Sequence, residues 1–366
     1  MTIRFIDLQR QYEHYKREIH QEMEEVLSSA TFIMGPKVQE LEETLAAYVG
    51  VKYAIACASG TDALLLALLA HHVKAGDEVI VPAFSFIATA EVIPLLGAQP
   101  VFVDIYEDTF NMDPEKIQGA ISEKTKGIIA VDLFGQCADY EPIKKIAEDN
   151  HLFVIEDAAQ AFGAQYKGRK ACSLTEVGCT SFFPAKPLGC YGDGGMVFTN
   201  SEPAAKIMRS MRVHGAGTSK YDNERLGFNA RLDTLQAAIL LAKFRHFPDE
   251  IYARQEVACF YTEQLKDFVK TPVIADQNIS VFAQYSIRAE ERNELQEFLK
   301  EAGIPTAIHY PKPLHLQPVF AQCKQGEGTF PVAEKISHEI LSIPMHPFLE
   351  RGEQEFIVQK IREFYQ

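Results

Sequence analysis

The sequence predicts an α/β protein in which a large domain with a mostly parallel central sheet and helices on both faces precedes a smaller C-terminal α/β domain. Short apolar runs alternate with helical segments between residues 53 and 213, and such alternation favours right-handed crossovers and a parallel sheet. From Pro248 the pattern changes to a helix, an alternating run, another helix and a short strand. The 366 residues suffice for about two domains. We therefore predict domains at 1–247 and 248–366.

The composition describes an ordinary globular protein, with 47% apolar and 23% charged residues. No apolar run approaches the ~20 residues of a membrane span, and the N-terminus lacks a signal-peptide pattern. The net charge of −14 argues against nucleic acid or an anionic membrane as a partner. Seven cysteines without paired spacing predict free thiols in a reducing cytoplasm and no metal site.

The N-terminal segment predicts two helices joined by an apolar turn. Apolar residues recur at three- and four-residue steps from Tyr12 to Val26 and again from Val38 to Tyr48. Between them, Phe32-Ile33-Met34 precedes Gly35-Pro36. This turn is either a buried loop or part of a binding site.

The remaining chain yields strands and helices in alternation. The expected strands are Tyr53–Ala56, Val79–Val81, Pro100–Asp104, Gly127–Leu133, Leu152–Ile155, Met196–Thr199, Val281–Arg288 and Thr306–Ile308. The expected helices are Ala63–Ala70, Ile87–Leu96, Pro114–Ile121, Pro142–Asn150, Ala204–Val213, Thr234–Lys243, Ile251–Phe268 and Arg292–Ala302.

Polar or aromatic residues follow several of these strands. Gly60-Thr61 opens a helix, so its free N–H groups predict either an anion site or a simple N-cap. Asp157 ends a buried strand and faces the crevice where parallel sheets bind ligands, unless it caps the next helix. Phe86, with Phe84 as a rival, stands at a strand–helix junction and could stack on a ring or belong to the core.

Lys186 is bracketed by Pro184 and Pro187 in a glycine-rich segment that follows a short apolar run. Proline keeps the preceding residue out of the helical region, which predicts a fixed, irregular turn. A lysine held in apolar surroundings has a lowered pKa and can form a Schiff base with a carbonyl compound. A surface lysine in a flexible loop is the simpler alternative.

The whole stretch resembles the Schiff-base segment of the DegT/DnrJ/EryC1/StrS family of sugar aminotransferases that use pyridoxal 5′-phosphate (PLP). The family pattern S-F-[FY]-P-x-K-x-L-G-x-x-G-D-G-G is matched at every fixed place from Ser181 to Gly195, and Glu156-Asp157-Ala158-Ala159-Gln160 matches as well. The resemblance runs from Phe5-Ile6-Asp7-Leu8 to Met345-His346-Pro347. It implies fold type I, the fold of PLP aminotransferases.

The resemblance also implies roles for individual residues. Lys186 forms the Schiff base and Asp157 pairs with the pyridine nitrogen, so these two are the catalytic residues. The cofactor, which becomes pyridoxamine 5′-phosphate (PMP) in the first half-reaction, is expected to contact Gly60, Thr61, Phe86, Asp157, Gln160, Ser181, Lys186 and Asn229. Asn229 reaches the cofactor phosphate of the other subunit, which implies a homodimer with both active sites at the interface.

The resemblance further implies the substrates. Dehydratase members of the family carry histidine in place of Lys186, so transamination is expected, with L-glutamate as the amino donor. Residues 186–192 and 229–236 look most like enzymes that aminate C3 of UDP-2-acetamido-2-deoxy-3-oxo-glucuronate for surface polysaccharides such as the O-antigen of lipopolysaccharide. The candidate substrate contacts are Phe32, Met34, Tyr191, Arg231, His309 and Tyr310.

Three alternatives stay open at this stage. The enzyme could act at C4, or at C3 of another UDP- or dTDP-linked keto-deoxysugar. A PLP-binding regulator without turnover is a hypothesis from a different class. A nucleotide-dependent dehydrogenase is weaker, because no G-x-G-x-x-G opens a βαβ unit. Arg231 could instead form a surface pair with Asp233, and His309 could be structural.

Overall fold

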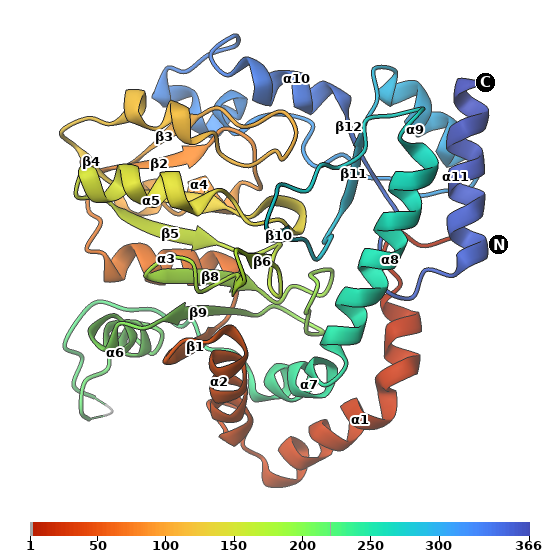
Figure 1. Ribbon diagram of the computed structural model, residues 1–366. Helices are drawn as coiled ribbons and strands as arrows, with labels where there is room; N and C mark the ends of the chain where they lie inside the picture. The colour runs from red at the N-terminus through yellow and green to blue at the C-terminus, as the bar shows by residue number, and fades with distance from the viewer. Residues whose placement is uncertain (1–2, 220) are drawn as a thin grey trace.

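The computed structural model describes residues 3–219 and 221–366, which form a central sheet flanked by helices and a smaller C-terminal unit (Figure 1). The sheet order is β1 (Tyr53–Cys57), β9 (Gly195–Thr199), β8 (Val177–Ser181), β5 (Phe153–Asp157), β4 (Thr125–Val131), β2 (Glu78–Pro82) and β3 (Gln99–Val103). Strand β9 runs antiparallel to both neighbours, and all other pairs are parallel. The predicted α/β fold with a mostly parallel sheet is confirmed.

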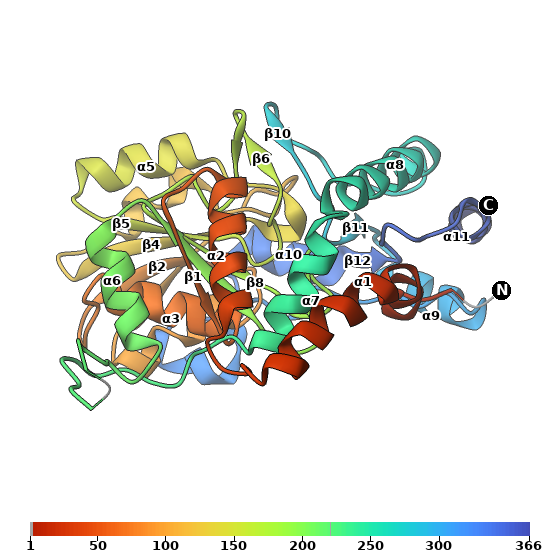
Figure 2. The same cartoon turned by 90° about the horizontal axis from the view of Figure 1, so that it is seen from below.

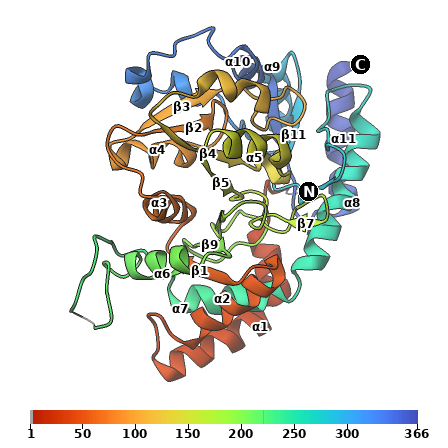
Figure 3. The ribbon, with the colours of Figure 1, turned by 60° about the vertical axis from the view of Figure 1, so that its left-hand side comes forward.

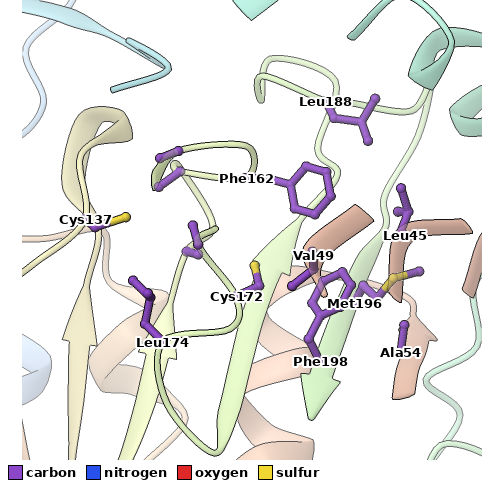
Figure 4. Packing of buried hydrophobic residues seen from close by; sticks show 14 of the residues in the cluster. Leu45, Val49, Ala54, Cys137, Phe162, Cys172, Leu174, Leu188, Met196 and Phe198 are labelled. Atoms are coloured by element: carbon purple, nitrogen blue, oxygen red, sulfur yellow. The ribbon is translucent and has the colours of Figure 1, made fainter. Parts of the chain in front are cut away.

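Helices cover both faces of the sheet because the side chains of each strand alternate between two cores. In β1, Ala54 and Ala56 join the core under α2 (Pro36–Val49), α5 (Tyr140–Asp149) and α7 (Thr234–Phe244). Ile55 and Cys57 join the opposite core with α3 (Gly60–Ala70), α6 (Glu202–Met211) and α10 (Pro331–Glu339). Figure 4 shows part of the first core, where Phe162 stacks on Phe198 with ring centroids 5.9 Å apart.

The C-terminal unit is built on the antiparallel pair β11 (Tyr285–Arg288) and β12 (Ile340–Ile343), with α8 (Phe247–Leu265), α9 (Arg292–Glu301) and α11 (Arg351–Tyr365). Its core includes Ile3 from the other end of the chain, and both termini lie on this side of the molecule (Figure 1). Leu314, Phe320 and Phe330 pack instead into the second core of the large sheet. The boundary at residue 248 stays a prediction.

Helix α1 (Leu8–Ser29) follows its N-cap residue Asp7, whose Oδ1 accepts a 2.8 Å hydrogen bond from Arg10 N. It packs against α7, and the two helices lie below the sheet in Figure 1 and beside each other in Figure 2. The loop between α6 and α7 projects away from the body of the protein over part of its length (Figure 3), whereas Arg212 at its start is buried. Among residues 3–219 and 221–366, no helix combines the length and hydropathy needed to cross a membrane.

Four sequence expectations about single elements were wrong in part. The expected helix 87–96 is α4 (Ala88–Glu91) followed by a 3₁₀ turn at Pro94–Leu96, because proline lacks the N–H that a continuing helix requires. The segment 114–121 forms two 3₁₀ turns, Pro114–Lys116 and Gln118–Ala120. Of 281–288 only the last four residues form a strand, and residues 306–308 contribute a single bridge from Ala307 to Ser342.

The smaller elements complete the description. A second sheet contains β10 (Asn278–Ile279), β6 (Gln165–Tyr166) and β7 (Arg169–Lys170), and further 3₁₀ turns lie at Leu133–Gly135, Leu314–Leu316 and Pro318–Cys323.

Candidate active site

A cavity of about 490 Å³ lies at the carboxyl edge of the central sheet, where parallel strands deliver residues to one crevice. The loops after β1, β2, β5 and β8 each contribute to its wall, and the C-terminal unit closes the other side. The sequence-predicted residues that line it are Gly60, Thr61, Phe86, Asp157, Gln160, Ser181, Lys186, His309 and Tyr310. Nine predicted residues therefore come together in one chain.

Asp157, the last residue of β5, is 4% exposed and faces this cavity. Its Oδ2 accepts a 2.7 Å hydrogen bond from Thr89 Oγ1, and its Oδ1 accepts one of 3.2 Å from Ala159 N. Burial raises the pKa of Asp157, although these two donors and the nearby Lys186 ammonium oppose the shift. A buried carboxylate in this position calls for a cationic partner on the cavity side.

Lys186 lies in a loop that its own main chain closes. Phe182 N donates to Gly194 O at 2.7 Å, Cys190 N donates to Phe182 O at 2.8 Å, and Lys186 N donates to Phe183 O at 2.9 Å. Surrounding protein atoms desolvate the amine and lower the pKa of Lys186 to about 8, while Asp157 acts in the opposite direction. The fixed turn expected from the two prolines is present, and the amine is poised for nucleophilic attack.

The N-terminus of α3 forms an anion cup at the other end of the cavity. Ser59 caps the helix by accepting a 3.0 Å hydrogen bond from Asp62 N. The first-turn N–H groups of Gly60 and Thr61 have no intrahelical partner. A Cβ at Gly60 would lie 2.7 Å from the Cβ of Ser181, so only glycine lets the two segments approach. The N-cap and the anion site that the sequence offered as alternatives can therefore both be present. The free backbone N–H groups at this helix end can bind a phosphate.

Phe86, Tyr310 and Gln160 also line the cavity. Phe86 is 53% exposed and lines the cavity, whereas Phe84 is fully buried in the core. Gln160 is held at both ends, because its Oε1 accepts from Phe134 N at 2.9 Å and its Nε2 donates to Tyr310 OH at 3.0 Å. Of the two rival phenylalanines, Phe86 is therefore the one that a ligand in this cavity can contact.

His309 approaches from the C-terminal unit. Its Nδ1 lies 2.9 Å from Ser342 Oγ, and burial, with a smaller contribution from the Lys186 charge, lowers the pKa of His309 to about 4. The imidazole is consequently neutral at pH 7, so it acts as a hydrogen-bonding group and carries no charge toward a ligand.

Five predicted residues lie outside this cavity in the single chain: Phe32, Met34, Tyr191, Asn229 and Arg231. Four of these form a second group on the surface. Thr234 N donates to Phe32 O at 2.9 Å, and a bridge joins Ile33 to Asp233, so the turn at 32–34 lies beside the segment 229–233. Arg231 Nε donates to Asn229 Oδ1 at 2.9 Å, and no ion pair joins Arg231 to Asp233 in the described chain.

Tyr191 is turned toward the interior instead. Its ring contacts Tyr12 edge-on at 6.2 Å between centroids, and Lys243 Nζ lies 5.0 Å from its centroid. The burial of Lys243 is not evident from the helical pattern, because a lysine in the last turn of a helix ordinarily lies near the free carbonyl groups and solvent.

Sequence reasoning missed several wall residues. Thr89, which bonds Asp157, lies one helical turn after Phe86, so the helical spacing could have identified it. Ser59 and Asp193 stand inside motifs that were recognised. Gln284 also lines the cavity, and its buried Oε1 has no partner in the described chain. Its local sequence is unremarkable, because only the long-range return of the C-terminal unit brings it here.

The wall residues fit PLP on three structural grounds. Asp157 is a buried carboxylate that needs a cation, which a protonated pyridine nitrogen provides. The Gly60–Ser181 approach leaves a cup of backbone donors for a phosphate. Lys186 offers an amine with a lowered pKa in the same cavity.

Comparison with known proteins agrees with this fit. The sequence model of the DegT/DnrJ/EryC1/StrS aminotransferase family matches residues 13–362. The chain is 50% identical to UDP-2-acetamido-2-deoxy-3-oxo-D-glucuronate aminotransferase from Pseudomonas aeruginosa over 356 residues, covering 97% of this chain and 98% of that protein. It is also 50% identical to a pleiotropic regulatory protein from Geobacillus stearothermophilus over 369 residues, covering 100% and 99%.

A similar protein has been solved with its cofactor bound. The crystal structure of NtdA from Bacillus subtilis with bound cofactor PMP superposes with a TM-score of 0.90 at 31% identity, covering 98% of this chain and 82% of that one.

Proposed function

The chain belongs to the DegT/DnrJ/EryC1/StrS family and is a PLP-dependent sugar aminotransferase, and from this premise we propose that it transfers the amino group of L-glutamate to C3 of UDP-2-acetamido-2-deoxy-3-oxo-glucuronate. The observation that carries the proposal is the single cavity that joins Lys186 to Asp157, combined with 50% identity over nearly the whole length of an enzyme named for that sugar.

In this proposal the residues of the large domain hold the cofactor. The α3 cup at Gly60 and Thr61, together with Ser181, binds the phosphate, and Asp157 holds a proton on the pyridine nitrogen. Bound PLP supplies an electron sink for the carbanion that forms when a substrate C–H bond is broken. Phe86 covers one face of the ring, and Gln160 contacts its phenolic oxygen.

Lys186 performs the proton transfer. With PLP held by these residues, the free Lys186 amine would take the proton from the α-carbon of L-glutamate and pass it to the cofactor, which would keep the amino group when 2-oxoglutarate is released. In the second half-reaction, Lys186 delivers a proton to the sugar carbon that receives nitrogen. A pKa near 8 leaves part of the amine neutral at physiological pH, as a base requires. The two half-reactions predict ping-pong kinetics.

A homodimer is supported by the charges of the cavity. Among the described residues that line it, Lys186 is the only lysine or arginine, whereas Asp157 and Asp193 are acidic. A phosphate, a diphosphate and a carboxylate need more positive charge than one chain supplies there. The surface group of Asn229 and Arg231, which lies outside the cavity, is therefore proposed to enter the site of a second subunit, together with the turn at Phe32 and Met34.

The uronate carboxylate then has two sets of candidates. Arg231 of a second subunit offers the planar fork that suits a carboxylate, and His309 and Tyr310 line the cavity of the chain itself. Because His309 is neutral at pH 7, we assign it a hydrogen bond and leave the charge neutralisation to Arg231. The ring of Tyr191 lies against Lys243. We therefore assign Tyr191 no direct contact with the substrate and only an effect on the shape of the loop.

The cell compartment is also part of the proposal. All seven cysteines of the described chain are free, and five of them are buried, which is in keeping with a reducing cytoplasm where nucleotide-linked sugars for surface polysaccharides are made.

The proposal is tested by converting the protein to its PMP form and incubating it with UDP- and dTDP-linked 3-keto and 4-keto sugars. We expect nitrogen at C3 of the UDP-linked 3-oxo-uronate, identified by NMR of the product. Nitrogen at C4, or a preference for a dTDP-linked sugar, would favour the alternative family substrates.

A regulator without turnover is the alternative that the name of the Geobacillus relative brings forward. Adding L-glutamate to the PLP-loaded protein distinguishes the aminotransferase from the regulator. An aminotransferase replaces the absorbance of lysine-bound PLP with that of PMP and releases one 2-oxoglutarate per site, whereas a regulator leaves the spectrum unchanged.

A further inference from the structure

The lysine loop is defined here as residues 182–194. Side chains of helix α7 form hydrogen bonds with two main-chain groups of this loop. Gly189 O accepts a hydrogen bond from Lys243 Nζ at the end of α7. Tyr191 N donates to Gln236 Oε1, two residues after the start of the same helix, at 2.9 Å. Apart from Phe183 N, which donates to Ser181 Oγ at 3.3 Å before the lysine, the other hydrogen bonds of the described loop are internal to it. Helix α7 is therefore the outside support for the part of the loop that follows Lys186.

The position of Gly189 is coupled to the turn that carries Lys186. A Cβ placed on Gly189 would lie 2.5 Å from Pro184 O and 2.6 Å from Phe183 O. Phe183 O is also the acceptor for Lys186 N. With this contact so close, a shift of the Gly189 peptide displaces the Phe183–Lys186 turn, and with it the amine.

Lys243 is an unusual residue for this place. It is 2% exposed, and among the described residues it makes no direct ion pair with Glu250, the acidic residue that most stabilises its charge. Burial lowers the pKa of Lys243 to about 8, with Glu250 opposing the shift and Arg254 adding to it. Burying an ammonium without a contacting carboxylate is unfavourable, so an apolar side chain of similar length would fill the space at lower cost.

We propose that Lys243 is a positioning residue for Lys186, acting through its hydrogen bond to the Gly189 carbonyl. The charge-assisted bond fixes the lysine loop against α7, so that the amine of Lys186 stays aimed into the cavity before any ligand arrives. The inference rests on the role proposed above for Lys186, and Glu250 is its supporting counter-charge. The bond does not touch substrate or cofactor, which distinguishes Lys243 from the catalytic residues.

Hydrogen exchange of the cofactor-free protein tests the anchor directly. Lys243→Met removes the donor but keeps the length of the side chain, and Lys206→Met, at an exposed lysine on α6, is the matched control. Because a hydrogen bond to a charged group is lost, we expect the amides of Lys186, Cys190 and Tyr191 to exchange at least about tenfold faster in Lys243→Met. Unchanged protection of these amides would overturn the proposal.

Capture of PLP gives a second readout that a general packing role does not move. Borohydride fixes PLP on Lys186, and mass spectrometry quantifies it with time. We expect capture to slow about tenfold in Lys243→Met and to recover in Lys243→Arg, which restores a charged donor. Equal slowing in both variants would show that packing alone matters. If Lys243→Met does not fold, Lys243→Gln takes its place in both experiments.

The two readouts also separate this inference from the proposed function. If the wild-type protein captures no PLP on residue 186, the proposed function fails, while the exchange result still decides whether Lys243 anchors the loop. If the wild-type protein captures PLP normally and Lys243→Met equals it in both rate and exchange, only the anchor is wrong.

Discussion

The two walls of the cavity differ in how completely their polar groups are bonded. On the large-domain wall, Asp157 receives two hydrogen bonds and Gln160 makes two. On the wall from the C-terminal unit, the buried Oε1 of Gln284 has no hydrogen-bond partner among the described residues, and within that same part of the chain His309 is hydrogen-bonded through Nδ1 alone. The first wall is preorganised for one constant ligand, whereas the second still offers hydrogen-bonding groups to a ligand that changes between half-reactions.

The same contrast extends to the residues outside the cavity. The predicted cofactor contacts, apart from Asn229, lie together in one chain, whereas Phe32, Met34 and Arg231 form part of the surface group. If a second subunit completes the substrate half, as proposed above, then changes in the surface group should alter the choice of sugar more than the binding of PLP. The variants below test this separation, from the largest expected effect to the smallest.

The largest effect is expected from replacing Lys186 on the cofactor wall. Lys186→Ala removes the group that carries protons in both half-reactions, so we expect turnover to fall by ~10³-fold or more. PLP should still bind through the α3 cup and Asp157. Steady-state assays with glutamate and keto sugar measure the first effect, and equilibrium dialysis of PLP measures the second.

Lys206→Ala on the surface of α6 is the control for Lys186→Ala and is expected to leave both values unchanged. Turnover by Lys186→Ala within tenfold of the wild-type rate would contradict the assignment of the catalytic amine.

On the cofactor wall, the residues singled out from the sequence do lie together in one cavity, and the reason is physical. Asp157 is the last residue of β5, and Gly60 and Lys186 lie a few residues after the ends of β1 and β8. The parallel order brings these strand ends to one edge whatever the details of packing. Their local sequence motifs also mark close approaches, because the absence of a Cβ at Gly60 lets its segment lie against Ser181. Gln284 was not predictable, because its place depends on a return of the chain over more than 80 residues after Ser181.

A shared active site predicts complementation between two defective chains. Arg231→Ala alone should lower kcat/KM for the keto sugar by about 10- to 100-fold, since a charge-assisted contact is lost. Mixed with Lys186→Ala and allowed to exchange subunits, it should recover about a quarter of wild-type activity, because half of the dimers then hold one intact site.

The mixture of Arg231→Ala and Lys186→Ala chains behaves differently if each active site uses the Arg231 of its own chain. If Arg231 serves its own chain, the heterodimer has no intact site and activity stays at or below that of Arg231→Ala. Mixing Lys186→Ala with an inactive Asp157→Asn chain is the control, because both changes damage the same chain's cavity and each partner still supplies Arg231; recovery is then excluded in either arrangement.

Gln284 tests the incompletely bonded wall. Gln284→Leu keeps the volume but removes the amide, and loss of one neutral hydrogen bond should lower kcat/KM for the keto sugar by about 3- to 10-fold. The L-glutamate half-reaction should change less, because the nucleotide-linked sugar is larger and presents more hydroxyl groups to this wall. Single-turnover absorbance changes measure the two half-reactions separately.

Gln359→Leu on α11, far along the chain and hydrogen-bonded to Glu363, serves as the control for Gln284. Equal losses in both half-reactions of Gln284→Leu would show that this residue shapes the cavity without distinguishing the substrates.

The smallest effect concerns the ion pairs that join the second wall to the first. Glu107 Oε1, in the large domain, accepts hydrogen bonds from Lys335 Nζ at 2.9 Å and from Arg288 Nη2 at 2.5 Å. Arg288 lies at the end of β11, four residues after Gln284. The bonds from Lys335 and Arg288 lower the pKa of Glu107 to about 2. A depressed carboxyl pKa stabilises the fold above the unfolded-state pKa of about 4.3, and this stabilisation is lost as pH falls toward 2.

Glu107→Gln should therefore lower the thermal midpoint of the cofactor-free protein at pH 7, and the difference from wild type should shrink between pH 5 and pH 3. The side chain is 40% exposed, so solvent screening limits the effect to about 1 kcal/mol, or a few degrees. Glu301→Gln, at an exposed carboxylate of α9, should show no such pH-dependent difference. Because Arg288 keeps Glu339 as a partner at 2.7 Å, the second wall should stay in place, and catalysis near pH 7 should change by less than about twofold. A large loss of activity with unchanged stability would mean that Glu107 positions the substrate wall more directly than its distance from the cavity suggests.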